Sequence, residues 1–230
     1  MDVKPLRPDF TICCADYENA GKAVVIANPN APTGISIPLS AIERICETNK
    51  EHVVIIDEAY ADFAEKPVSA VSLLSRYPNL LIVQTFSKSR SLAGGRVGFA
   101  LGSEALINDL ETIKFSTNPY NVNRLSMAAA VEAMKDRAYF EMNCEKIRET
   151  RAWTTKALEE LGFHVLPSDA NFVFAESKGI PGKALYLKLK DNGILVRHFD
   201  DPKITNFNRI TIGTRKDMEA LVRTIKELYS

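Results

Sequence analysis

Three short aliphatic runs constrain the fold of this chain more than any other feature of its sequence. They span residues 24–28 (VVIAN), 53–57 (VVIID) and 80–84 (LLIVQ), and none has the alternating polar residues of a half-exposed strand. Runs of this kind are typical of parallel strands that are covered on both faces. Between the first two runs, Ser40 and Glu43 form a capping-box pattern, which predicts a right-handed strand–helix–strand unit. The sequence therefore predicts an α/β fold with a mostly parallel sheet.

The pattern of the chain changes in its last third. Residues 136–161 contain neither glycine nor proline, which predicts one long helix, and Gly162 follows where a helix C-cap is expected. The later runs are short and predict a smaller α+β unit, so we divide the chain into a large domain at residues 1–150 and a small C-terminal domain at residues 151–230. The expected strands of the second unit are 163–166, 171–175, 194–199 and 209–212, and its expected helices are 181–192 and 216–229.

The composition argues against several functional classes. Lysine and arginine number 29 and aspartate and glutamate 29, so the formal net charge of +0 provides no basic field for nucleic acid or a membrane surface. No apolar stretch approaches the roughly 18–20 residues that span a membrane, and the first ten residues lack the apolar run of a secretory signal. We therefore expect a cytoplasmic protein. The four cysteines and three histidines have neither disulfide nor zinc spacing, and we expect no metal site.

A polar cluster follows each of the three aliphatic runs. The clusters are residues 28–34 (NPNAPTG), 57–60 (DEAY) and 85–96 (TFSKSRSLAGGR). Each one alone is typical of a turn, a helix cap or a solvated loop. Together they follow consecutive strands of one parallel sheet, whose carboxyl ends are where ligands bind in such folds. The sequence therefore predicts a carboxylate, a phenol, an amine and a guanidinium at one rim.

This set of groups fits the demands of pyridoxal phosphate. That cofactor needs a lysine amine to form an imine, which Lys88 supplies, and a carboxylate that keeps its ring nitrogen protonated, which Asp57 supplies. Tyr60 is the expected donor to the phenolate oxygen. Hydroxyl groups and a guanidinium are suited to the cofactor phosphate. The residues expected around that phosphate are Thr85, Ser87 and Arg96.

The same clusters resemble a known enzyme family. The segments NPNAPTG, VIIDEAY and TFSKSRSLAGGRVG resemble the fold-type I pyridoxal-phosphate enzymes, in particular the histidinol-phosphate aminotransferase branch. The resemblance implies that Lys88 carries the cofactor and that Asp57, Tyr60, Thr85 and Arg96 contact it. It also implies that residues 1–150 are the C-terminal part of the large cofactor-binding domain and that the smaller domain lies on the substrate side.

Two segments of the small domain resemble the arginine-bearing strands of that family. They are residues 193–197 (GILVR) and 208–213 (NRITIG). The resemblance implies that Arg209 binds the anionic end of the substrate and that Arg197 is its partner for a phosphate or a distal carboxylate. Without the upstream clusters both would be read as surface arginines. Asn171 also matches a position near the substrate.

The chain departs from the family pattern at two places. The asparagine that the family commonly has directly before Pro-Thr-Gly is Ala31 here, and of the flanking Asn28 and Asn30 we take Asn30 as the candidate that contacts the cofactor. The resemblance also begins inside the family pattern, so its N-terminal third has no counterpart in these residues. In the family that third supplies a phosphate-binding loop, a ring that stacks on the cofactor and contacts to a second subunit.

The function that the resemblance implies is amino transfer between histidinol phosphate, or an aromatic amino acid, and 2-oxoglutarate, with glutamate as product. Such an enzyme would serve histidine biosynthesis, and we expect a homodimer at full length. Two alternatives remain open at this point: a decarboxylase of a phosphorylated amino acid, and an inactive truncated fragment. A nucleotide-binding dehydrogenase is disfavoured because no Gly-x-Gly-x-x-Gly follows a strand.

Overall fold

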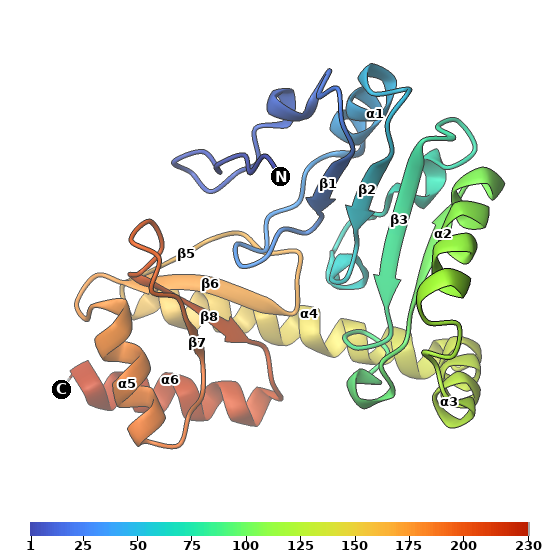
Figure 1. The fold of residues 1–230 in the computed structure, drawn as a ribbon. Helices are drawn as coiled ribbons and strands as arrows, with labels where there is room; N and C mark the ends of the chain where they lie inside the picture. Colours follow the sequence, from blue (N-terminus) through green and yellow to red (C-terminus); the bar gives the residue numbers. More distant parts are fainter. Residues whose placement is uncertain (230) are drawn as a thin grey trace.

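A computed structural model describes residues 1–229 and contains two four-stranded sheets (Figure 1). The first sheet has the order β1 (Val24–Ala27), β2 (Val54–Asp57), β3 (Leu80–Thr85) and β4 (Gly98–Gly102). Strands β1, β2 and β3 pair in parallel, whereas β4 returns antiparallel to β3. The α/β class and the three parallel strands are therefore as predicted.

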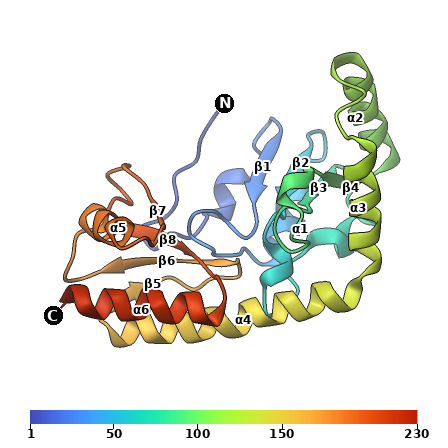
Figure 2. The ribbon, with the colours of Figure 1, turned by 90° about the horizontal axis from the view of Figure 1, so that it is seen from below.

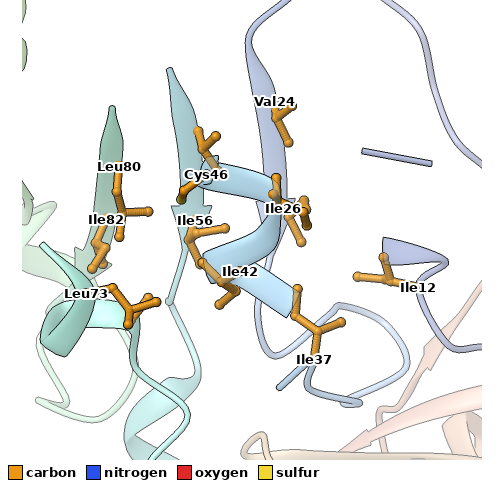
Figure 3. Close-up of a cluster of buried hydrophobic side chains, with 13 residues drawn as sticks. Ile12, Val24, Ile26, Ile37, Ile42, Cys46, Ile56, Leu73, Leu80 and Ile82 are labelled. Atoms are coloured by element: carbon orange, nitrogen blue, oxygen red, sulfur yellow. The ribbon is translucent and has the colours of Figure 1, made fainter. Parts of the chain in front are cut away.

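One face of the first sheet carries the main core of this half (Figure 3). Helix α1 (Leu39–Thr48) packs here, and its Ile42 belongs to the same core cluster as alternate residues of the strands such as Ile56 and Ile82. All three isoleucines are fully buried, and each contributes about 1.5–3 kcal/mol. The opposite face is open within residues 1–229, where the strand residues Val25 and Val83 are 64% and 36% exposed. The expectation that the strands are covered on both faces is wrong for this part of the chain.

Helix α1 begins differently from the expected capping box. It begins at Leu39 after Pro38, which is extended and makes no side-chain cap. Ser40 therefore lies inside the first turn, and the Glu43 carboxylate bonds Arg76 instead of reaching back to the helix start. The helix is present where the sequence predicts it, but its N-terminal cap is not.

Three helices follow the first sheet: α2 (Glu104–Thr117), α3 (Arg124–Lys135) and α4 (Arg137–Glu160). Helix α4 packs against the second sheet and continues past the ends of the strands of the first sheet, so it joins the two halves of the chain (Figure 1, Figure 2). It ends before Gly162, whose φ of 83° favours glycine, as the sequence predicts. The expected domain boundary at residue 150 lies within α4, and the division into two domains stays a prediction.

The second sheet is antiparallel and has the order β5 (Phe163–Val165), β6 (Phe172–Ser177), β8 (Phe207–Thr211) and β7 (Arg197–His198). Its core packs against α4, α5 (Gly182–Asp191) and α6 (Arg215–Tyr229), and Figure 2 shows α4 and α6 side by side. The strand expected at 194–199 is reduced to β7. The cause is local, because the Ile194 amide donates to Leu189 O and closes the end of α5.

Two structural features are absent from residues 1–229. No helix in this range combines the length and apolar character that a membrane crossing requires. The same residues contain no group of three or more histidine, cysteine, aspartate or glutamate side chains placed to hold a metal ion. The four cysteines are free thiols.

Candidate active site

The strand register places Asp57 and Thr85 on the open face of the first sheet. Asp57 is the last residue of β2 and lies opposite Val83 of β3. Thr85 follows Val83 by two residues, and side chains two apart in a strand share a face. The Asp57 Oδ1 atom accepts a hydrogen bond from the Ala59 amide at 3.0 Å, and the carboxylate is otherwise exposed. The two predicted cofactor contacts therefore project from neighbouring strands in one direction.

The loop after β3 carries Lys88 next to Tyr60. Thr85 Oγ1 accepts from the Ser87 amide at 3.0 Å, which turns the chain directly after the strand. The Lys88 side chain is exposed, and its Nζ atom lies 5.4 Å from the centre of the Tyr60 ring. The amine and the phenol that the sequence predicts at one rim are thus brought together.

Arg96 lies at the same end of the sheet but faces its own loop. The β3–β4 pairing sets Thr85 opposite Gly98. Arg96 comes only two residues before Gly98 in the chain. Arg96 adopts φ 54°, and its Nη1 atom donates to Ala93 O at 3.2 Å. Its side chain is exposed, so only that bond has to break before the guanidinium can turn. The predicted phosphate contact of Arg96 stays a prediction.

A chain of ring contacts connects this rim to the second sheet. The Tyr60 and Phe172 rings pack edge to face with centroids 5.1 Å apart. The Arg209 guanidinium carbon lies 5.0 Å from the centre of the Phe172 ring. Lys88, Tyr60, Phe172 and Arg209 therefore form one continuous row across the two halves of the molecule, although 121 positions separate Lys88 from Arg209 (209 − 88).

Two arginines lie opposite each other on the second sheet. Arg197 of β7 is the register partner of Arg209 of β8. Like charges directly opposite on neighbouring strands are destabilising, and a bound anion relieves that repulsion. The Arg209 Nε atom is buried and has no hydrogen-bond partner among residues 1–229. This unused donor and the adjacent charge are the features expected of an anion site.

The three asparagines have different surroundings. Asn28 is fully buried, and its amide donates to Val68 O and accepts from the Ile37 amide, so its side chain is used inside the fold. Asn30 Oδ1 accepts from Thr33 Oγ1 at 3.1 Å. Asn171 directly precedes Phe172 in the row of contacts, and its carbonyl accepts from the Ile212 amide. The structure therefore favours Asn30 over Asn28, and the cofactor role of Asn30 stays a prediction.

Two carboxylates with supporting roles were missed by the sequence reasoning. Asp62, in the 3-10 turn η2 (Ala61–Phe63), accepts a short hydrogen bond from the buried Ser89, next to Lys88. Glu58 follows Asp57 and is only 3% exposed. The Asp-x-x-Tyr spacing gave no signal for either of them, because their partners lie 27 and at least 11 positions away.

Glu58 predicts a pH dependence of folding. Burial raises the pKa of its carboxyl above the ordinary value of 4.5, and hydrogen bonds from Ser69, Ala70 and Gln84 oppose that shift. A carboxyl with a higher pKa in the folded state binds its proton more tightly there, so its contribution favours folding at low pH and is lost as pH rises from 4.5 through the folded pKa. We expect the free energy of unfolding to fall over that window, and to fall less in Glu58→Gln. Urea denaturation across pH measures both slopes, and equal slopes contradict the assignment.

The donor set at the rim fits pyridoxal phosphate. An exposed amine, a carboxylate, a phenol and hydroxyls converge at one sheet end, and the open sheet face leaves Asp57 accessible. Arg209 then lies at the far end of the row of contacts. These residues would hold the cofactor on one side and an anionic ligand on the other.

Comparisons with known proteins show the family to which the chain belongs. Residues 4–225 match the family described as aminotransferase class I and II. The histidinol-phosphate aminotransferase of Brachyspira hyodysenteriae is 53% identical over 222 residues, which are 96% of this chain and 62% of that relative. The chain therefore spans about three fifths of the length of that curated relative.

Solved structures of two histidinol-phosphate aminotransferases are also similar to this chain. The histidinol-phosphate aminotransferase of Clostridium acetobutylicum has a TM-score of 0.88 at 27% identity and covers 97% of this chain and 69% of its own. That of Sinorhizobium meliloti, solved in complex with pyridoxal-5'-phosphate, has a TM-score of 0.84 at 26% identity, over 99% of this chain and 64% of its own. These likenesses confirm the predicted transferase fold. Because the match runs from before the first strand into the closing helix, the chain belongs to the class I and II aminotransferase family.

Proposed function

We propose that these residues form part of a pyridoxal-phosphate-dependent aminotransferase that acts on histidinol phosphate, with 2-oxoglutarate as amino acceptor. The observation that carries the proposal is the row of contacts from Lys88 through Tyr60 and Phe172 to Arg209. It supports the proposal because the Lys88 amine and the Arg209 guanidinium lie at the two ends of that row. The names of the relatives favour histidinol phosphate over an aromatic amino acid as the donor.

The cofactor, when bound, supplies an aldehyde for the substrate amine and a ring that withdraws electrons from the adjacent carbon. Lys88 would hold that aldehyde through its Nζ amine, and once the substrate amine has displaced it, the free Nζ atom would act as the general base that takes the α-proton from the substrate. Asp57 keeps the ring nitrogen charged through its negative charge. Tyr60 donates to the phenolate oxygen, and Thr85, Ser87 and Arg96 hold the phosphate.

Arg209 and Arg197 set the substrate class. The paired donors of a guanidinium match the oxygens of a phosphate ester and those of a carboxylate. One pair of arginines can therefore bind both the amine donor and 2-oxoglutarate. The Arg209 guanidinium lies over the face of the Phe172 ring, which holds it in place by a cation–π contact. The substrates we propose are therefore small amines and keto acids with a second anionic end.

A titration with pyridoxal phosphate tests the cofactor assignment. We expect a saturable yellow absorbance, and after borohydride reduction a peptide carrying the pyridoxyl group at Lys88. A second measurement follows the keto product and carbon dioxide from histidinol phosphate or a phosphorylated amino acid, which separates amino transfer from decarboxylation. A protein that stays colourless at saturating cofactor contradicts the proposal and supports a folded remnant without activity.

Asp57→Asn is expected to slow the amino-transfer half-reaction with glutamate by about 10- to 1,000-fold. An opposite charge next to a titrating group shifts its pKa by about 1–3 units, and the neutral amide removes that effect from the ring nitrogen. Trapping at Lys88 is expected to persist, since the amine is untouched. Asp109→Asn on the exposed α2 is the matched control. Equal rates in the two variants would show that Asp57 does not act on the ring.

A further inference from the structure

The buried side chain of Arg151 connects the two halves of the site through backbone carbonyls. Arg151 lies on α4 and is only 4% exposed. Its Nη1 atom donates to Phe63 O at 2.9 Å and to Ala170 O at 2.6 Å. Phe63 belongs to the first half of the chain, and Ala170 precedes the second sheet. A single nitrogen therefore ties together two segments that lie 107 positions apart (170 − 63).

Each of these carbonyls belongs to a segment that directly adjoins or hydrogen-bonds a residue of the proposed site. On the cofactor side, the Phe63 amide donates to Tyr60 O, so the turn that Arg151 holds also fixes Tyr60. On the substrate side, Ala170 is followed directly by Asn171 and Phe172, and Ser168 Oγ binds both the Ala170 amide and Phe172 O. The edge-to-face contact of Tyr60 and Phe172 lies between the two tethered segments.

Simple packing does not account for an arginine at this position. Burial lowers the pKa of its guanidinium, and the charges of Asp169 and Glu65 only oppose that shift. Apolar residues of similar volume often replace buried charged groups at no loss of stability. The feature that an apolar side chain does not reproduce is the pair of bonds to Phe63 O and Ala170 O, and unpaired buried carbonyls are costly.

We propose that Arg151 is a positioning residue that fixes the spacing between the cofactor-side Tyr60 and the substrate-side Asn171 and Phe172. This inference deepens the proposed function and rests on it for the meaning of the two sides. Without the guanidinium, the two carbonyls turn toward water and the turn at Phe63 separates from the segment at Ala170. The anion site then no longer lies at a fixed distance from Lys88.

The first test needs no cofactor. Nuclear Overhauser contacts between the Tyr60 and Phe172 rings report their spacing directly. We expect the contact in the wild-type protein and in Arg148→Met, a control one turn earlier whose bond to Asp62 O is long, 3.4 Å. We expect it to be lost in Arg151→Met and kept in Arg151→Lys, because one nitrogen makes both native bonds and an ammonium has enough donors.

These variants separate positioning from bulk stabilisation. A residue that only fills space is rescued better by methionine than by lysine, and the opposite order is expected here. If Arg151→Met does not fold, Arg151→Gln decides, because its amide nitrogen lies two bonds nearer the backbone than Nη1 and is too short to reach both carbonyls. A ring contact that persists in Arg151→Met, or in Arg151→Gln, overturns the inference.

The second test uses the protein loaded with pyridoxal phosphate. The affinity for 2-oxoglutarate, followed by the cofactor absorbance, is expected to weaken about tenfold in Arg151→Met, which corresponds to about 1.4 kcal/mol. The amount of pyridoxyl group trapped at Lys88 is expected to be unchanged. If the wild-type protein traps none, the proposed function fails, and the ring contact still decides the role of Arg151. Equal 2-oxoglutarate affinities in Arg151→Met and Arg148→Met contradict the inference.

Discussion

Lys88→Ala is expected to abolish the covalent retention of pyridoxal phosphate. Alanine has no amine, so borohydride has no imine to reduce and the denatured protein should carry no pyridoxyl group. The effect is all or none, which makes it the largest change that we expect in this protein. The measurement is the intact mass of the chain after reduction and denaturation.

The control for this experiment is another exposed lysine. Lys66 follows the η2 turn and is exposed like Lys88, so non-specific imine formation should affect both. Lys66→Ala is expected to retain the same mass increase as the wild-type protein. A mass increase that survives in Lys88→Ala would place the cofactor elsewhere and would remove the basis for every role assigned to Asp57, Tyr60 and Arg96.

The features that the sequence predicted correctly are local ones. Strands β1, β2 and β3 are short aliphatic runs, and the order of such runs along the chain is enough to predict neighbouring parallel strands. Asp57 and Thr85 terminate two of them, so their placement on one rim follows from the strand ends alone. Residue type and position along the chain were therefore enough to predict where these two side chains lie.

The features that the sequence did not predict depend on contacts between distant segments. The bonds of Arg151 to Phe63 and Ala170 join positions 88 and 19 residues apart, and no local pattern marks an arginine that faces inward. The bond between Ser89 and Asp62 is of the same kind. An arginine in a helix is normally exposed, and the burial of Arg151 depends on the packing of α4 against the segments of Phe63 and Ala170.

The exposure of the first sheet was also misjudged, for a physical reason. Runs such as residues 24–28 have the composition of strands buried on both faces, yet Val25 is 64% exposed among residues 1–229. The composition of a strand indicates that its side chains are suited to apolar contacts. It does not indicate how exposed each face of the strand is among the described residues. The short β7 has a comparable cause, since the closure of α5 takes up residues that otherwise extend an edge strand.

Arg209→Met is expected to weaken the binding of 2-oxoglutarate by about a hundredfold or more. Charge-assisted hydrogen bonds contribute about 1.5–3 kcal/mol each, and a guanidinium fork makes two of them to a carboxylate. A loss of about 3 kcal/mol corresponds to a factor of roughly 150 in the dissociation constant. Methionine keeps much of the apolar stem that packs near Phe172, so the fold should persist. Calorimetric titration of the cofactor-loaded protein measures the change.

The size of the loss in related variants tests whether Arg209 acts as a fork. Arg209→Lys keeps the charge but not the paired donors, and we expect it to recover only part of the affinity. Arg197→Met is expected to cost less than Arg209→Met, because the Arg197 side chain is exposed and solvent screens its charge. Arg215→Met is the matched control, since that guanidinium stacks 3.9 Å over the Trp153 ring, away from the anion site. Loss of affinity in Arg215→Met as large as in Arg209→Met would show a general effect of charge rather than a site.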